Sequence, residues 1–145
     1  MAYKLIIIVA LVVFLQNAFA AEYEVAMRNS GADGFMVFEP GFLKIDKGDT
    51  VKFVPVDTGH NSASYYTPEG GTTWNGALNG SVSATFNEEG VYIYQCTPHI
   101  VAGMAGVIQV GEAANLEEAK KAGEKLKATM AAEKQRIDKY LSQVQ

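Results

Sequence analysis

Apolar and polar residues alternate in short runs from residue 21 to about residue 110. The runs lie at residues 23–27, 35–38, 42–45, 50–54, 81–86, 91–94 and 106–110. Alternation with a period of two is typical of half-buried β-strands. Turn-forming residues separate the runs, as at Lys47-Gly48-Asp49, and no helical period interrupts them. The pattern predicts a mainly β protein with seven or eight short strands, arranged as a Greek-key sandwich rather than a parallel sheet.

The period changes after Asn115. Apolar residues now recur at helical spacing, at Leu116, Ala119, Leu126, Met130, Ile137, Leu141 and Val144. Asn115 followed by Glu118 is typical of a helix N-cap, and Gly123 is the candidate break between two helices. Such a stripe could bind a partner, but amphipathic helices usually bury their apolar face on their own domain. We therefore expect residues 112–145 to form a helical extension packed on a sandwich of residues 21–111.

The first twenty residues have the features of a signal peptide. Lys4 gives a positive start, Leu5–Leu15 is apolar, and Ala18-Phe19-Ala20 presents small residues before the cleavage point. We predict cleavage after Ala20 and a single domain of residues 21–145 in the periplasm. The alternative is an uncleaved membrane anchor, although the apolar run is short for a bilayer span.

The charge pattern limits the class of partner. Residues 21–111 carry four basic and ten acidic side chains, whereas residues 112–145 carry seven basic and six acidic ones. An acidic body of this kind disfavours binding to nucleic acid or to an anionic membrane.

The candidate chemistry centres on one cysteine and two histidines, which are all that the chain contains. A lone cysteine in an exported protein needs burial, a partner or a metal, because no intramolecular disulfide is possible. Cys96, His99 and Met104 have the spacing Cys-x2-His-x4-Met between two predicted strands, and a loop of that length can direct three side chains at one ion. A trigonal site of two histidines and one cysteine with a distant methionine is the arrangement of copper electron-transfer centres. His60 is the remaining histidine, and loops of a sandwich gather at its ends, so His60 is predicted to complete a copper site.

Other roles for these residues stay open from the sequence alone. Cys96 could be an inert buried thiol, the histidines could be ordinary loop residues, and Met104 could fill the core. Zinc also accepts one cysteine and two histidines, but a thioether is a poor zinc ligand.

The ligand set also bears on the class of protein. Four protein ligands leave no open position for a substrate, which predicts an electron carrier and not an enzyme. The alternative function is a copper-binding or copper-delivery protein that does not cycle between redox states. Methionine-rich or histidine-rich tracts would favour delivery, and the sequence contains none.

Several segments resemble those of cupredoxins, and in particular of pseudoazurins. The segments that carry the resemblance are Phe35–Pro40, Lys47–Val51, Pro55–Asp57, Gly59–Asn61 and Cys96–His99. Asn115-Leu116-Glu117 resembles the start of the helical extension that separates pseudoazurins from plastocyanins.

The resemblance implies a fold, a metal and a role. The fold is an eight-stranded sandwich with two C-terminal helices, and the metal is one type 1 copper ion with His60, Cys96, His99 and Met104 as ligands. The role is that of a soluble periplasmic monomer that passes single electrons to a redox partner. Candidate partners are copper nitrite reductase, nitrous oxide reductase or a c-type cytochrome. His99 is then expected to reach the surface within an apolar patch, for which the candidates are Met36, Pro98, Ile100, Val101 and Ala102.

The sequence departs from the family at two positions near the predicted site. Many pseudoazurins carry lysines where this chain has Thr58 and Gln95. Lysines there attract acidic partners, and electrostatic attraction acts mainly on the association rate. We therefore predict weaker salt-dependent docking, or a different partner.

Overall fold

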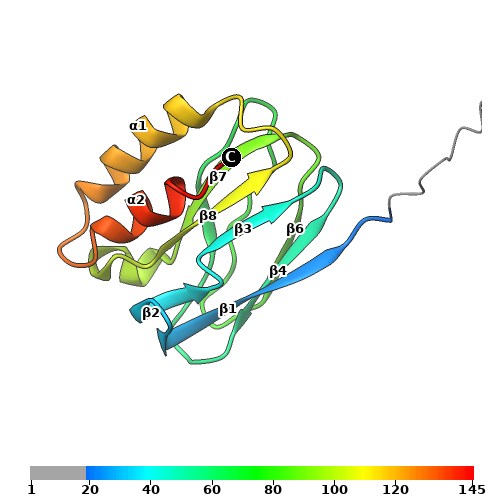
Figure 1. Ribbon diagram of the computed structural model, residues 1–145. Coiled ribbons are helices and arrows are strands. Elements are labelled where there is room, and N and C mark those ends of the chain that lie inside the picture. The colour runs from blue at the N-terminus through cyan, green and yellow to red at the C-terminus, as the bar shows by residue number, and fades with distance from the viewer. Residues whose placement is uncertain (1–18) are drawn as a thin grey trace, which may run out of the picture.

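The computed structural model describes residues 19–145, so the predicted signal peptide lies outside the described residues except for Phe19 and Ala20. Eight strands form two sheets packed face to face, and helices cover one side of the sandwich (Figure 1). The strands are β1 (Glu22–Gly31), β2 (Gly34–Glu39), β3 (Phe42–Ile45), β4 (Thr50–Pro55), β5 (Ala63–Tyr66), β6 (Val82–Thr85), β7 (Gly90–Gln95) and β8 (Ala105–Val110). The predicted eight-stranded sandwich is confirmed.

Each sheet contains four strands and mixes parallel with antiparallel pairs. The first sheet has the order β2-β1-β4-β6, and the second has the order β3-β8-β7-β5. The pairs β1–β4 and β3–β8 are parallel, and the other pairs are antiparallel. β4 ends at Pro55 and β7 ends at Gln95, and the predicted ligands His60 and Cys96 follow these two strands.

The space between the sheets is filled largely by aromatic side chains, because the inward positions of the alternating strands carry large apolar residues. Tyr94 is fully buried, and its ring centroid lies 4.7 Å from that of Phe38 and 5.0 Å from that of Phe53. Phe53 in turn stacks on Trp74 at 5.3 Å. Offset and edge-to-face contacts of this kind add to the stability gained from burial. Cys96 and Met104 belong to the same buried cluster.

A short 3₁₀-helix and two α-helices complete the chain: η1 (Thr97–Ala102), α1 (Leu116–Lys127) and α2 (Gln135–Leu141). The two α-helices lie across β7 and β8 on the outer face of the second sheet (Figure 1). Their apolar side chains, including Leu126 and Ile137, pack against Ile93 and Val107 of those strands. No helix of residues 19–145 is both long and apolar enough to cross a membrane.

The start of α1 differs in detail from the expected cap. Asn115 occupies the N-cap position, but its side chain makes no capping hydrogen bond to the helix. Its carboxamide oxygen instead accepts a hydrogen bond from the Val91 backbone N–H at 2.7 Å, and its amide donates to the Val91 carbonyl at 3.1 Å. Asn115 therefore ties the helical extension to β7.

The predicted break at Gly123 is wrong. Gly123 lies inside α1 and is buried, and a β-carbon there would come 2.9 Å from Cδ1 of Leu141 in α2. The glycine thus allows two helices to approach closely. The helices are separated instead by residues 128–134, where Glu133 adopts a φ of 50°.

Candidate metal centre

Three side chains with metal-binding atoms converge at one end of the sandwich. Sγ of Cys96 lies 3.8 Å from Nδ1 of His60 and 3.5 Å from Nδ1 of His99, and the two Nδ1 atoms are 3.1 Å apart. His60 and Cys96 are fully buried, whereas His99 is partly exposed. Within residues 19–145, the cysteine, histidine and carboxylate atoms that lie close enough to meet at one ion belong to these three side chains.

The local backbone explains how residues so close in sequence reach a common point. Cys96 is the last extended residue after β7, and Pro98 in the first turn of η1 favours a sharp change of direction. Gly103 ends η1 with a φ of 81°, in the left-handed region that glycine adopts without strain. The Cys96 N–H then donates to the Met104 carbonyl at 3.0 Å and closes the loop. We call residues 96–104 the ligand loop.

His60 enters from the other sheet and is oriented by a neighbour on β1. Its Nε2 lies 2.9 Å from the carboxamide oxygen of Asn29. That oxygen can only accept a hydrogen bond, so Nε2 carries the proton and Nδ1 directs its lone pair toward Cys96. This is the arrangement by which proteins fix the tautomer of a metal-binding histidine.

Asn61 joins the His60 segment to the ligand loop. Its side-chain oxygen accepts from the Thr97 backbone N–H at 2.7 Å, and its amide group donates to Oγ1 of Thr97 at 3.1 Å. The same amide donates to the Gly76 carbonyl at 3.1 Å. These bonds hold the two ligand-bearing segments in one relative position.

Burial sets the electrostatics of the cluster. It raises the pKa of the Cys96 thiol, and the backbone N–H groups of Asn61 and His99 oppose that rise by stabilising the thiolate. Burial, followed by the charge of His99, lowers the pKa of His60. The cluster thus favours a neutral His60, which has a free lone pair, and supplies two backbone N–H donors to a sulfur anion.

The geometry and the donor chemistry fit a metal ion. Metal–nitrogen and metal–sulfur bonds of about 2.0–2.3 Å place neighbouring donor atoms roughly 3–4 Å apart, which matches the separations of 3.1, 3.5 and 3.8 Å between the three donors. Two imidazoles and one thiolate suit copper.

The predicted site residues are not all equivalent in the structure. His60, Cys96 and His99 are brought together, and Met104 is fully buried at the base of the ligand loop, directly before β8. Among the five candidates for the apolar patch, Pro98 and Val101 are exposed, with Val101 at 57 %. Met36, Ile100 and Ala102 are partly buried, and Ile100 packs toward the helices.

Comparison with known proteins places this cluster in a family. A family model described as copper-binding proteins of the plastocyanin/azurin family matches residues 25–111. A pseudoazurin from Paracoccus pantotrophus is 41 % identical over 138 residues, which cover 93 % of this chain and 92 % of the relative. The chain belongs to the pseudoazurin family. A putative pseudoazurin from Rhizobium leguminosarum bv. viciae is 44 % identical over 111 residues, covering 74 % of this chain and 73 % of the relative.

A solved structure supports the same assignment at the level of the fold. The crystal structure of native pseudoazurin from Hyphomicrobium denitrificans covers 86 % of this chain and 98 % of its own, with a TM-score of 0.75 and 37 % identity. Pseudoazurins are electron-transfer proteins rather than enzymes, and the family binds one type 1 copper ion. The predictions of copper as the cofactor and of a protein without enzymatic activity are therefore confirmed.

Two residues that support the cluster were not identified from the sequence. Asn29 lies 31 positions from His60, and Arg136, whose contacts with the ligand loop are described below, lies 33 positions from Gly103. Neither belongs to a motif or a periodic pattern that could have singled it out.

Proposed function

We propose that His60, Cys96, His99 and Met104 bind one type 1 copper ion and that the protein is a periplasmic one-electron carrier. The observation that carries the proposal is the convergence of two Nδ1 atoms and one Sγ atom within 3.8 Å of one another, beside a buried methionine. Copper bound there takes up and releases one electron by alternating between Cu(II) and Cu(I).

The chain's own residues suit this role because they hold the donors in place. Asn29 fixes the ring of His60, Asn61 joins the His60 segment to Thr97, and the Cys96–Met104 hydrogen bond closes the ligand loop. Held donors rearrange little when the charge of the ion changes, and this favours fast electron transfer. Burial of Cys96 and Met104 keeps water from the sulfur ligands.

His99 is the proposed exit for the electron. It is the partly exposed member of the cluster, and the exposed residues Pro98 and Val101 flank it in the chain. An apolar surface around an exposed ligand suits brief contact with another redox protein. We propose as partners a copper nitrite reductase, a nitrous oxide reductase or a c-type cytochrome.

The proposed domain layout follows from the same role. Residues 1–20 act as a signal peptide cleaved after Ala20, and residues 21–145 form one domain, with the sandwich at 21–111 and the helical extension at 112–145. The helices pack on β7 and β8 through a shared apolar cluster, which supports one folding unit. Expression of the full chain in a bacterium, followed by mass spectrometry of the periplasmic fraction, tests this: a mature chain that begins at Ala21 is expected.

Copper titration of residues 21–145 tests the function. One equivalent of Cu(II) is expected to produce an intense visible band from thiolate-to-copper charge transfer, which ascorbate removes and ferricyanide restores. Cys96→Ser should lack the band, because the hydroxyl cannot replace the thiolate. A protein that binds Cu(I) tightly but cannot be cycled would indicate copper delivery, and a band that survives in Cys96→Ser would refute the proposed site.

A further inference from the structure

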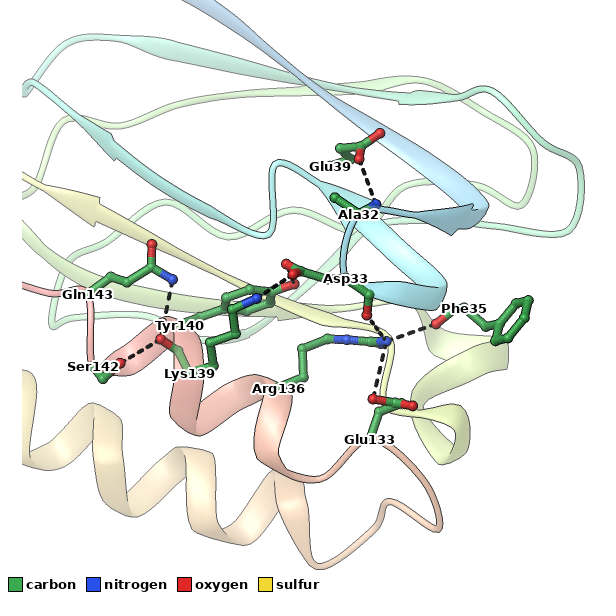
Figure 2. A network of polar contacts seen from close by, with 10 residues as sticks. All are labelled: Ala32, Asp33, Phe35, Glu39, Glu133, Arg136, Lys139, Tyr140, Ser142 and Gln143. Atoms are coloured by element: carbon green, nitrogen blue, oxygen red, sulfur yellow. Dashed lines mark hydrogen bonds and ion pairs between the residues drawn. The ribbon is translucent and has the colours of Figure 1, made fainter.

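Arg136 of α2 is a buried cation bound to backbone carbonyls from two distant segments. Its side chain is 3 % exposed. Nη2 donates to the carbonyls of Asp33 and Phe35 at 3.0 and 2.9 Å. Figure 2 shows the guanidinium reaching these two residues, which lie at the start of β2. Nη1 donates to the carbonyls of Met36 and Gly103 at 2.9 and 2.8 Å. One side chain therefore joins the start of β2 to the ligand loop.

The charge of Arg136 has little direct compensation. Its ion pair with Glu133 spans 3.8 Å, and that carboxylate is 51 % exposed. Taking a guanidinium out of water is costly, and well-packed apolar residues often stabilise a fold as well or better. Stability is therefore a weak explanation for this residue, whereas four hydrogen bonds from one planar group fix the relative positions of the segments that accept them.

The hydrogen bond to Gly103 acts on the backbone next to Met104. The outer side of the ligand loop receives further bonds from the segment between α1 and α2, because the backbone N–H groups of Ala131 and Ala132 donate to the Val101 carbonyl at 2.8 and 3.2 Å. The helical extension thus holds the end of the loop at two carbonyls. In Figure 1 the segment between the two helices lies beside η1.

The other end of this connection is also anchored. The Asp33 carboxylate accepts from the Tyr140 hydroxyl at 2.7 Å and pairs with Lys139, both on α2 (Figure 2). The turn between β1 and β2 is therefore attached to the same helix that carries Arg136. Through Arg136, this attachment fixes the position of the ligand loop relative to the first sheet.

We propose that Arg136 is a positioning residue for the copper site, which sets the backbone of Gly103 and Met104 relative to Cys96. The inference rests on the proposed function, since it assumes that Met104 is the axial ligand. The axial ligand tunes the redox properties of such sites, so a small displacement of the Met104 backbone alters the spectrum even in a fully folded protein.

The experiment compares three variants of residues 21–145. Arg136→Met removes the hydrogen bonds and the charge, and Arg136→Lys keeps the charge but not the planar group that reaches four carbonyls. Lys134→Met is the matched control: it removes a neighbouring exposed cation at the start of α2 that makes no bond to the ligand loop or to the turn between β1 and β2. We expect both Arg136 variants to change the position or intensity of the thiolate-to-copper band, Arg136→Met more than Arg136→Lys, and the control to keep the wild-type spectrum.

A second measurement needs no copper. In the metal-free protein, hydrogen exchange of the Met104 amide, which donates to the His99 carbonyl at 3.2 Å, is expected to be faster in both Arg136 variants than in the control when all are compared at equal global stability.

The outcomes separate the two proposals. A wild-type protein without a visible copper band refutes the proposed function itself. A thiolate-to-copper band that keeps its wild-type position and intensity in Arg136→Lys, with unchanged Met104 exchange, overturns the positioning role while leaving the proposed function intact. If Arg136→Met does not fold, the result for Arg136→Lys decides.

Discussion

The sandwich frame and the ligand loop position metal-binding atoms by different physical means. His60 follows β4 and is fully buried, and a single hydrogen bond from its ring to the Asn29 carboxamide oxygen on β1 orients it. Cys96 and Met104 instead sit at the two ends of a loop whose outer side is bonded to the helical extension. One half of the proposed site therefore depends on the strands of the sandwich, while the other half depends on helices that contribute no proposed ligand.

The largest effect on stability is expected from a substitution that removes packing between the helices and the second sheet but leaves the ligand loop untouched. Leu126→Ala removes a buried side chain from the cluster between the helices and the second sheet. A loss of about 2–5 kcal/mol in the free energy of unfolding is expected, measured by urea denaturation of the metal-free protein. The visible spectrum of the folded copper form should stay as in the wild type, because this side chain carries no group that could hold the ligand loop. A changed spectrum would show that packing of the helices also determines the geometry of the copper site.

Gly103→Ala is expected to lower the stability of the protein and to change the spectrum of its copper form. A β-carbon at Gly103 would lie 2.7 Å from the Ala132 carbonyl oxygen, and the φ of 81° disfavours any other residue. We expect a loss of about 1–3 kcal/mol in the free energy of unfolding together with a changed position or intensity of the thiolate-to-copper band. Gly48→Ala is the control, since its φ of 96° imposes similar backbone strain but no atom lies within 4 Å of the added carbon. Equal spectra in both variants would contradict a role for the contact with Ala132.

Asn29→Ala tests whether the hydrogen bond between His60 and Asn29 orients the ring of His60. Loss of the carboxamide frees Nε2 of His60 and allows the ring to turn or change tautomer. Partners of this kind are commonly worth about 10–100-fold in metal affinity, and because Asn29 is exposed water can partly replace it, so we expect a weakening of about tenfold. Competition with a copper chelator measures the affinity, with Asn87→Ala, at an exposed asparagine between β6 and β7, as the control. Affinity equal to that of the wild type would show that the strands alone orient His60.

The smallest effect concerns docking. Thr58 is exposed and Gln95 is partly buried, and neither carries a charge that could attract an acidic partner. Stopped-flow electron transfer to an acidic redox protein is therefore expected to depend little on salt concentration. The double variant Thr58→Lys/Gln95→Lys should react faster at low salt and lose that gain as salt is added. A steep loss of rate with salt in the wild type would contradict the prediction.

The sequence predicted most of the sandwich because seven of the strands have a clear two-residue period. The strand that no run predicted, β5, is short and changes register between Ser64 and Tyr66, so it leaves little periodic signal. Gly123 misled because a glycine inside a helical pattern can mark either a break or a close contact. Only the three-dimensional packing against Leu141 distinguishes the two.

The residues of the candidate site also divide into those that the sequence predicts and those that it does not. Spacing along the chain suffices for Cys96, His99 and Met104, which belong to one loop, and the shortage of histidines left His60 as the remaining candidate. Asn29 and Arg136 could not be predicted, because their contacts join segments far apart in the sequence, and in the case of Met36 and Arg136 the separation is 100 positions. Supporting residues of this kind depend on how strands and helices meet, which the sequence pattern does not encode locally.

The ligand set itself is tested most directly by the crystal structure of copper-loaded residues 21–145, with anomalous diffraction measured on both sides of the copper absorption edge. We expect a single anomalous peak bonded to Nδ1 of His60, Nδ1 of His99 and Sγ of Cys96, with the thioether sulfur of Met104 as the fourth, more distant ligand. A peak away from these atoms, or a copper ion whose fourth ligand is water rather than Met104, would contradict it.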